Sequence, residues 1–145
     1  MTQLSMAKFR GRSYVNLPKN LCPGYTDLLL GRTDKQKEYG GVICDRPEAS
    51  YILLQRLLRH TDRGQAVWQI VQVQSVLKPN PQSLVLGVGC QQHLRRTASS
   101  EPIFALVQPT AKKTYKTLAA WKVSLARETF IALEPQKVVC EDILL

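Results

Sequence analysis

The fold prediction depends on one stretch, Asp45-Arg-Pro-Glu-Ala-Ser-Tyr-Ile-Leu-Leu-Gln-Arg-Leu-Leu-Arg-His60, after which no breaker occurs until Gly64. Asp45 and Glu48 have the spacing of a capping box, and Pro47 suits the first turn of a helix. At 100° per residue, the apolar side chains fill an arc of roughly 160°. The pattern predicts an amphipathic helix whose outer face carries a basic stripe, formed by Arg56, Arg59 and Arg63.

Downstream of this stretch the sequence changes to β-like runs separated by short polar connections. These runs are rich in β-branched and aromatic residues and alternate in part. They cover residues 66–77, 83–90, 102–108, 114–125, 130–133 and 138–140. Residues 114–125 also fit a helix. We therefore predict an α+β fold in which one amphipathic helix packs on a four- to five-stranded antiparallel meander.

Upstream of the predicted helix, residues 1–44 show little periodicity and contain several prolines and glycines. We expect this part to be an irregular basic segment that wraps the core. The predicted division of the chain is thus 1–44 for this segment and 45–145 for a single α+β domain.

Four cysteines, Cys22, Cys44, Cys90 and Cys140, allow three complete pairings, and none lies in a C-x-x-C motif. Cys22 and Cys44 would close a loop rich in turn residues, and Cys90 and Cys140 would meet across a sheet. Two disulfides would indicate an exported protein. Four buried thiols in a reducing cytosol are the alternative, which we favour slightly because the amino terminus has no apolar signal core.

The sequence offers little chemistry of the kind that enzymes use. It lacks G-x-S-x-G, H-E-x-x-H and P-loop motifs, and its acidic residues are scattered. Cys90 and His93 have the spacing of a weak nucleophile–base candidate, but Cys90 is expected to face the core. We therefore predict no enzyme, no cofactor and no metal site.

Positive charge is the strongest functional signal, because 20 Lys and Arg face 11 Asp and Glu, for a net charge of +9. Such an excess attracts anionic partners. The prediction is a binding or accessory domain that engages an anionic macromolecule, either a nucleic acid or an acidic protein surface. The expected contact residues are Arg56, Arg59, Arg63, Arg95, Arg96, Lys112, Lys113, Tyr115 and Lys116. Lys8, Arg10, Arg12 and Lys19 also make the amino-terminal arm basic, with Phe9 and Tyr14 between them.

A helix followed by an antiparallel meander over residues 45–140 resembles the cystatin-like architecture in the order of its elements. In that family a Gln-Val-Val-Ala-Gly hairpin loop enters a protease cleft. Here Gln72-Val-Gln-Ser75 lies inside a predicted strand and lacks the glycine. The resemblance therefore implies element order, while an exported, disulfide-stabilised binding or inhibitor-like domain is the alternative function and a Cys–His enzyme the second one.

Overall fold

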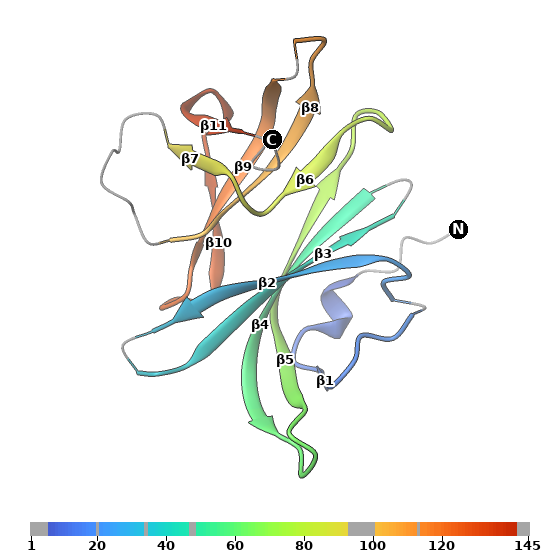
Figure 1. The fold of residues 1–145 in the computed structure, drawn as a ribbon, viewed down its shortest axis with the longest axis vertical. Helices are drawn as coiled ribbons and strands as arrows, with labels where there is room; N and C mark the ends of the chain where they lie inside the picture. Colours follow the sequence, from blue (N-terminus) through green and yellow to red (C-terminus); the bar gives the residue numbers. More distant parts are fainter. Residues whose placement is uncertain are drawn as a thin grey trace. The chain divides into compact units, whose positions relative to one another are not determined.

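A computed structural model of the chain describes residues 6–19, 21–33, 35–46, 49–92, 101–112 and 114–141. Nearly all regular structure in these residues is β-strand (Figure 1). The predicted α+β fold is therefore wrong, and residues 49–60, predicted as its helix, form a strand instead. The described helical residues form two short 3-10 turns, η1 (Met6–Phe9) and η2 (Pro135–Lys137). None of them is long and apolar enough to cross a membrane.

The chain forms two compact units, unit 1 (Met1–Val76) and unit 2 (Leu77–Leu145). Unit 1 is built on a five-stranded antiparallel sheet with the order β1-β5-β4-β3-β2. Its strands are β1 (Ser13–Tyr14), β2 (Tyr25–Arg32), β3 (Glu38–Asp45), β4 (Ala49–His60) and β5 (Ala66–Leu77). Residues 1–44, predicted to be irregular, thus contribute three strands, and β3 crosses the suggested boundary between residues 44 and 45.

Strand β4 is the predicted helix, and its burial shows why the sequence misleads. Ile52, Leu53 and Leu54 are consecutive and all fully buried, so both faces of this strand are covered. A strand buried on both sides lacks the alternation of apolar and polar residues that marks a half-exposed strand. Its sequence pattern can therefore resemble that of a helix. The predicted capping residue Asp45 instead accepts a hydrogen bond from the Ser50 hydroxyl at the turn between β3 and β4.

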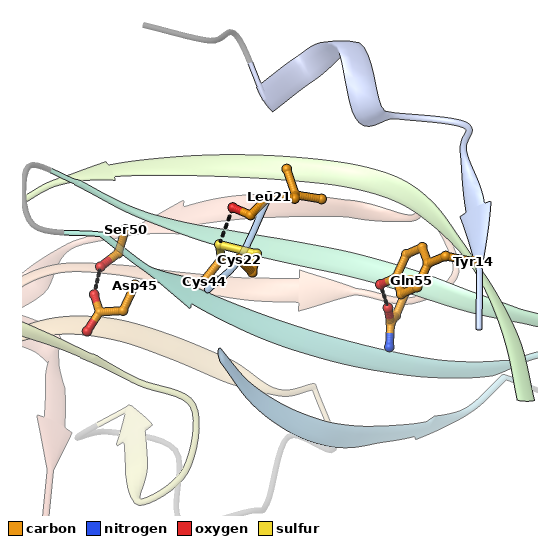
Figure 2. The surroundings of a disulfide bond; sticks show 7 residues. All are labelled: Tyr14, Leu21, Cys22, Cys44, Asp45, Ser50 and Gln55. Carbon is orange, nitrogen blue, oxygen red and sulfur yellow. Dashed lines mark hydrogen bonds between the residues drawn. A yellow bond between two sulfur atoms is a disulfide. The ribbon is translucent and has the colours of Figure 1, made fainter. Parts of the chain in front are cut away.

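One face of the unit 1 sheet holds a core closed by the chain between β1 and β2. Register places Val42 opposite Leu53 and Cys44 opposite Tyr51. Leu17, Leu21 and Cys22 pack on this face, together with the buried Ile70 of β5. The disulfide Cys22–Cys44 ties the covering segment to β3 (Figure 2), and the Cys44 Sγ atom lies 3.4 Å from the Leu21 carbonyl oxygen.

Unit 2 contains a four-stranded antiparallel sheet and a short two-stranded ribbon. The sheet has the order β10-β9-β8-β6, and the ribbon pairs β11 with β7. Their bounds are β6 (Leu84–Leu86), β7 (Cys90–Gln92), β8 (Ile103–Pro109), β9 (Tyr115–Ser124), β10 (Thr129–Leu133) and β11 (Val138–Cys140). Residues 114–125, left open between strand and helix, are therefore mainly strand, and the predicted antiparallel pairing is confirmed.

The ribbon of unit 2 packs against its sheet. Val138 and Cys140 of β11 belong to one buried cluster with Ala105, Val107 and Ala120 of the sheet. The Thr117 hydroxyl donates to the Val138 carbonyl oxygen at 2.8 Å, which fixes β11 against β9. Cys90 and Cys140 are direct neighbours across the ribbon and form its disulfide.

Candidate functional site

The three arginines of the predicted helix stripe do not share a face. In a strand, side chains three residues apart point to opposite sides of the sheet, so Arg56 and Arg59 diverge. Arg56 is half-buried within β4, where its Nη2 donates to Gln69 Oε1 at 2.9 Å. Arg59 is exposed near the end of β4, and Arg63 is exposed in the turn that follows it. The stripe was a consequence of the wrong helix assignment.

The predicted contact residues of unit 2 are only partly described. Lys112 lies exposed in the turn between β8 and β9, and Lys116 is exposed on β9. Tyr115, the neighbour of Lys116 on this strand, instead packs against the buried cluster of unit 2. Lys113, Arg95 and Arg96 lie outside the described residues. The described cations here belong to unit 2, whereas Arg56, Arg59 and Arg63 belong to unit 1.

A better-built group of cations lies in the N-terminal basic loop, which we define as residues 8–12. Lys8, Arg10 and Arg12 are all exposed. The Lys8 ammonium and the Arg12 guanidinium lie 5.4 and 5.3 Å from the centre of the Phe9 ring. Both distances suit cation–π attraction, and half-buried Phe9 also packs against the unit 1 core. The aromatic ring therefore attracts two cations of the loop.

Backbone hydrogen bonds attach this loop to the edge of the sheet at β5. The Gly11 N–H donates to the Ile70 carbonyl at 2.6 Å, and the Ile70 N–H donates to the Arg12 carbonyl at 2.9 Å. Gln69 Nε2 donates to the Gly11 carbonyl at 3.0 Å. Gly11 has φ +91°, a conformation that glycine adopts without strain. The loop is thus ordered by the strand beside it.

All four cysteines are oxidised in the structure, as Cys22–Cys44 and Cys90–Cys140. The sulfur of Cys90, which the sequence offered as a weak nucleophile, is bonded to Cys140. Its suggested partner His93 lies outside the described residues. Among the described residues, no group of three or more His, Cys, Asp or Glu side chains is arranged to hold a metal ion.

The sequence did not reveal a cleft of about 230 Å³ in unit 1, which we call the tyrosine cleft. It opens over the same sheet face as the core, where register places Gln55 opposite Gly40 and Gly40 opposite Leu29. Among the aromatic and polar side chains that line it are Tyr14, Tyr25, Asp27, Gln55 and Trp68. They come from four strands, so no short sequence motif could have shown them together.

Polar groups in the tyrosine cleft are held by specific contacts. The Tyr14 hydroxyl donates to Gln55 Oε1, and Figure 2 shows the Gln55 Nε2 atom on the side away from Tyr14. Burial raises the pKa of Tyr14, and the charge of Asp27 and then Tyr25 raise it further, so the phenol stays neutral. Partial burial also raises the pKa of the Asp27 carboxyl.

Comparison with protein-family models, with curated proteins and with solved structures found no match to this chain.

Proposed function

We propose that the protein is a binding domain, rather than an enzyme, and that it holds a nucleic acid by its phosphate backbone against a basic edge of unit 1. The observation that carries this proposal is the N-terminal basic loop, in which Lys8, Arg10 and Arg12 are exposed on an ordered backbone. Cations fixed in this way release counterions from a phosphate backbone at a low cost in conformational entropy.

The basic edge continues from the loop toward the turn that joins β4 and β5. The loop is bonded to β5 at Ile70, and this strand begins at Ala66, directly after the turn. Four residues of extended chain span about 14 Å. Arg59 and Arg63 at that end therefore extend the cationic surface, although Asp62 in the same turn offsets part of their charge.

Phosphate contact suits this edge better than an acidic protein surface does. Protein interfaces are centred on buried aromatic or arginine anchors surrounded by apolar contact. Phe9 is the aromatic residue of the loop, and its ring already contacts the core and two cations. The hydrogen-bond donors that the loop offers to a partner are guanidinium and ammonium groups. Guanidinium suits bidentate contact with phosphate.

A charge-neutralising triple variant tests the basic edge. We expect Lys8→Gln/Arg10→Gln/Arg12→Gln to weaken binding of a fluorescent single-stranded DNA homopolymer, measured by anisotropy. The slope of log affinity against log salt should fall by about two units, because each single-strand phosphate contact contributes roughly 0.7. The loss of cation–π contacts should lower the free energy of unfolding by about 1 kcal/mol.

The matched control is Lys19→Gln/Lys35→Gln/Lys37→Gln, which removes three charges from exposed positions of the same unit outside the loop. Equal losses in the two variants would show that net charge alone attracts DNA, and the edge would have no special role. Tighter binding of an acidic polyglutamate peptide than of DNA would contradict the choice of partner. We expect Arg59→Gln/Arg63→Gln to weaken DNA binding less than the loop variant does.

A second candidate, an exported and disulfide-stabilised binding domain, is favoured by one specific observation. Each unit contains one disulfide between two of its own cysteines. Structural disulfides of this kind persist in oxidising compartments. We expect protein from its native source, alkylated before and after reduction, to react only after reduction. Four thiols that react at once in the unfolded but unreduced protein would place it in a reducing compartment and would remove this candidate.

A further inference from the structure

We propose that the tyrosine cleft binds a small organic ammonium cation that carries a hydrogen-bond acceptor. This site is separate from the basic edge and is independent of the proposed nucleic-acid binding. The cleft combines negative charge, aromatic walls, the Gln55 amide donor and a small volume.

The charge of the cleft is opposite to that of the protein as a whole. Asp27 is the charged side chain among the described residues that line it, whereas the chain carries a net charge of +9. The Asp27 carboxylate lies on β2, opposite Val42, and its side chain stays exposed to solvent. A ligand that enters this cleft therefore meets negative charge in a molecule that otherwise repels cations.

Aromatic rings line the space around this carboxylate. Tyr14 comes from β1, Tyr25 from β2 and Trp68 from β5, and all three line the cleft. Tyr25 and Asp27 are two residues apart on one strand and therefore face the same side of the sheet. The faces of aromatic rings attract ammonium groups, and the attraction is strongest for tryptophan. Rings and carboxylate together favour an organic cation over a hydrated metal ion.

Gln55 supplies the second element of recognition. Its side chain is 5% exposed, and its Oε1 atom accepts the Tyr14 hydroxyl. The Nε2 group, on the other side of this amide, is the donor that Gln55 offers to a ligand. A ligand oxygen placed near the ammonium group would accept this donor, and a cation without an acceptor would leave it unused.

Gly40 lets two lining side chains of the cleft, Gln55 and Trp68, pack closely against β3. A Cβ atom at this position would lie 3.2 Å from Gln55 Nε2, 3.3 Å from the Leu28 carbonyl oxygen and 3.4 Å from the Trp68 ring. Any larger residue would press the amide and the indole into new positions. With a volume of about 230 Å³, the cleft is smaller than the usual site of a drug-sized ligand, so it suits a compact headgroup.

The test uses choline as the probe, because it combines a trimethylammonium group with a hydroxyl acceptor. Binding is followed by NMR through the indole N–H of Trp68, while the indole N–H of Trp121, on unit 2, serves as the internal reference. We expect the Trp68 signal to shift saturably and the Trp121 signal to stay in place. The uncharged isostere of choline, with a tert-butyl group in place of trimethylammonium, should cause no saturable shift.

Asp27→Asn tests the charge with little change of shape. We expect it to weaken choline binding about tenfold, which corresponds to about 1.4 kcal/mol. Asp62→Asn is the matched control, because it removes the same charge from an exposed turn outside the cleft, and it should leave choline affinity unchanged. Burial raises the pKa of Asp27, so on acidification its carboxylate gains a proton at a higher pH than an ordinary aspartate does. Choline affinity in the parent protein should therefore begin to fall at that higher pH. The Tyr14 and Tyr25 hydroxyls are the other titratable groups that line the cleft.

Three outcomes would overturn the proposal. The neutral isostere could bind as tightly as choline, which would make the cleft a simple apolar hollow. Asp27→Asn could retain the affinity of Asp62→Asn, which would remove the role of the carboxylate. Finally, the Trp68 signal could fail to shift, or could shift together with that of Trp121, in the folded parent protein.

Discussion

Replacing Cys90 and Cys140 together by alanine is expected to lower the free energy of unfolding of unit 2 by about 4 kcal/mol. The disulfide joins residues separated by 50 positions, and a loop of this length constrains the unfolded chain strongly. Domains are stable by only about 5–15 kcal/mol, so this one bond supplies a large share. Denaturant unfolding in a Trp68→Phe background, where Trp121 reports on unit 2, measures the effect.

The size of this effect follows from where the bond lies. Strands β7 and β11 have three residues each, and a two-stranded ribbon of that length is not stable in isolation. The disulfide holds the ribbon together, so that Val138 and Cys140 stay packed on the sheet. The matched variant, Cys22→Ala/Cys44→Ala, should lower the free energy of unfolding of unit 1 by about 3 kcal/mol, because the loop closed by the Cys22–Cys44 disulfide is shorter. An unchanged midpoint for Trp121 would show that the ribbon holds without its bond.

Leu53→Ala is the second substitution with a large expected effect, a loss of about 3 kcal/mol within a usual range of about 2–5. Leu53 is fully buried on the central strand β4, opposite Val42 and in one cluster with Ile70. Truncation there leaves a cavity that neighbouring strands, held by their hydrogen-bonded register, can fill only in part. Urea unfolding in a Trp121→Phe background, followed by Trp68 fluorescence, gives the free energy of unfolding.

Leu29→Ala is the control for this substitution, because it makes the same chemical change in the same sheet. Leu29 on the edge strand β2 is 87% exposed, so its truncation should change the free energy of unfolding by less than about 0.5 kcal/mol. Similar losses in the two variants would contradict the described packing of β4.

The sequence predicted the second half of the chain better than the first. Residues 66–77, 103–109 and 129–133 are strands as their β-branched content and partial alternation indicated. The helix prediction for residues 49–60 was wrong. Leu and Arg favour helices only weakly, whereas pairing with β3 and burial on both faces determine that this stretch forms a strand. Local propensity cannot register a neighbour that lies far away in the chain.

The hairpin of β2 and β3 was missed for a related reason. Gly40 and Gly41 lie inside β3 and made this stretch look like a loop, yet Gly40 is required by the Gln55 amide and the Trp68 ring that lie against it. The cleft shares this origin, since its residues come from strands that only the sheet brings together. The apolar run from Leu28 to Leu30 was the sign in the sequence that this stretch forms a strand.

Because each disulfide lies within one unit, the two bonds can form one after the other along the chain. During synthesis, Cys22 and Cys44 emerge before Cys90 and Cys140. In an oxidising compartment they can therefore close without meeting a wrong partner, and the two remaining sulfurs are then left with one choice. Both incorrect pairings would link an early cysteine to a late one. In such a compartment, synthesis from the amino terminus would therefore favour the native pairing by timing.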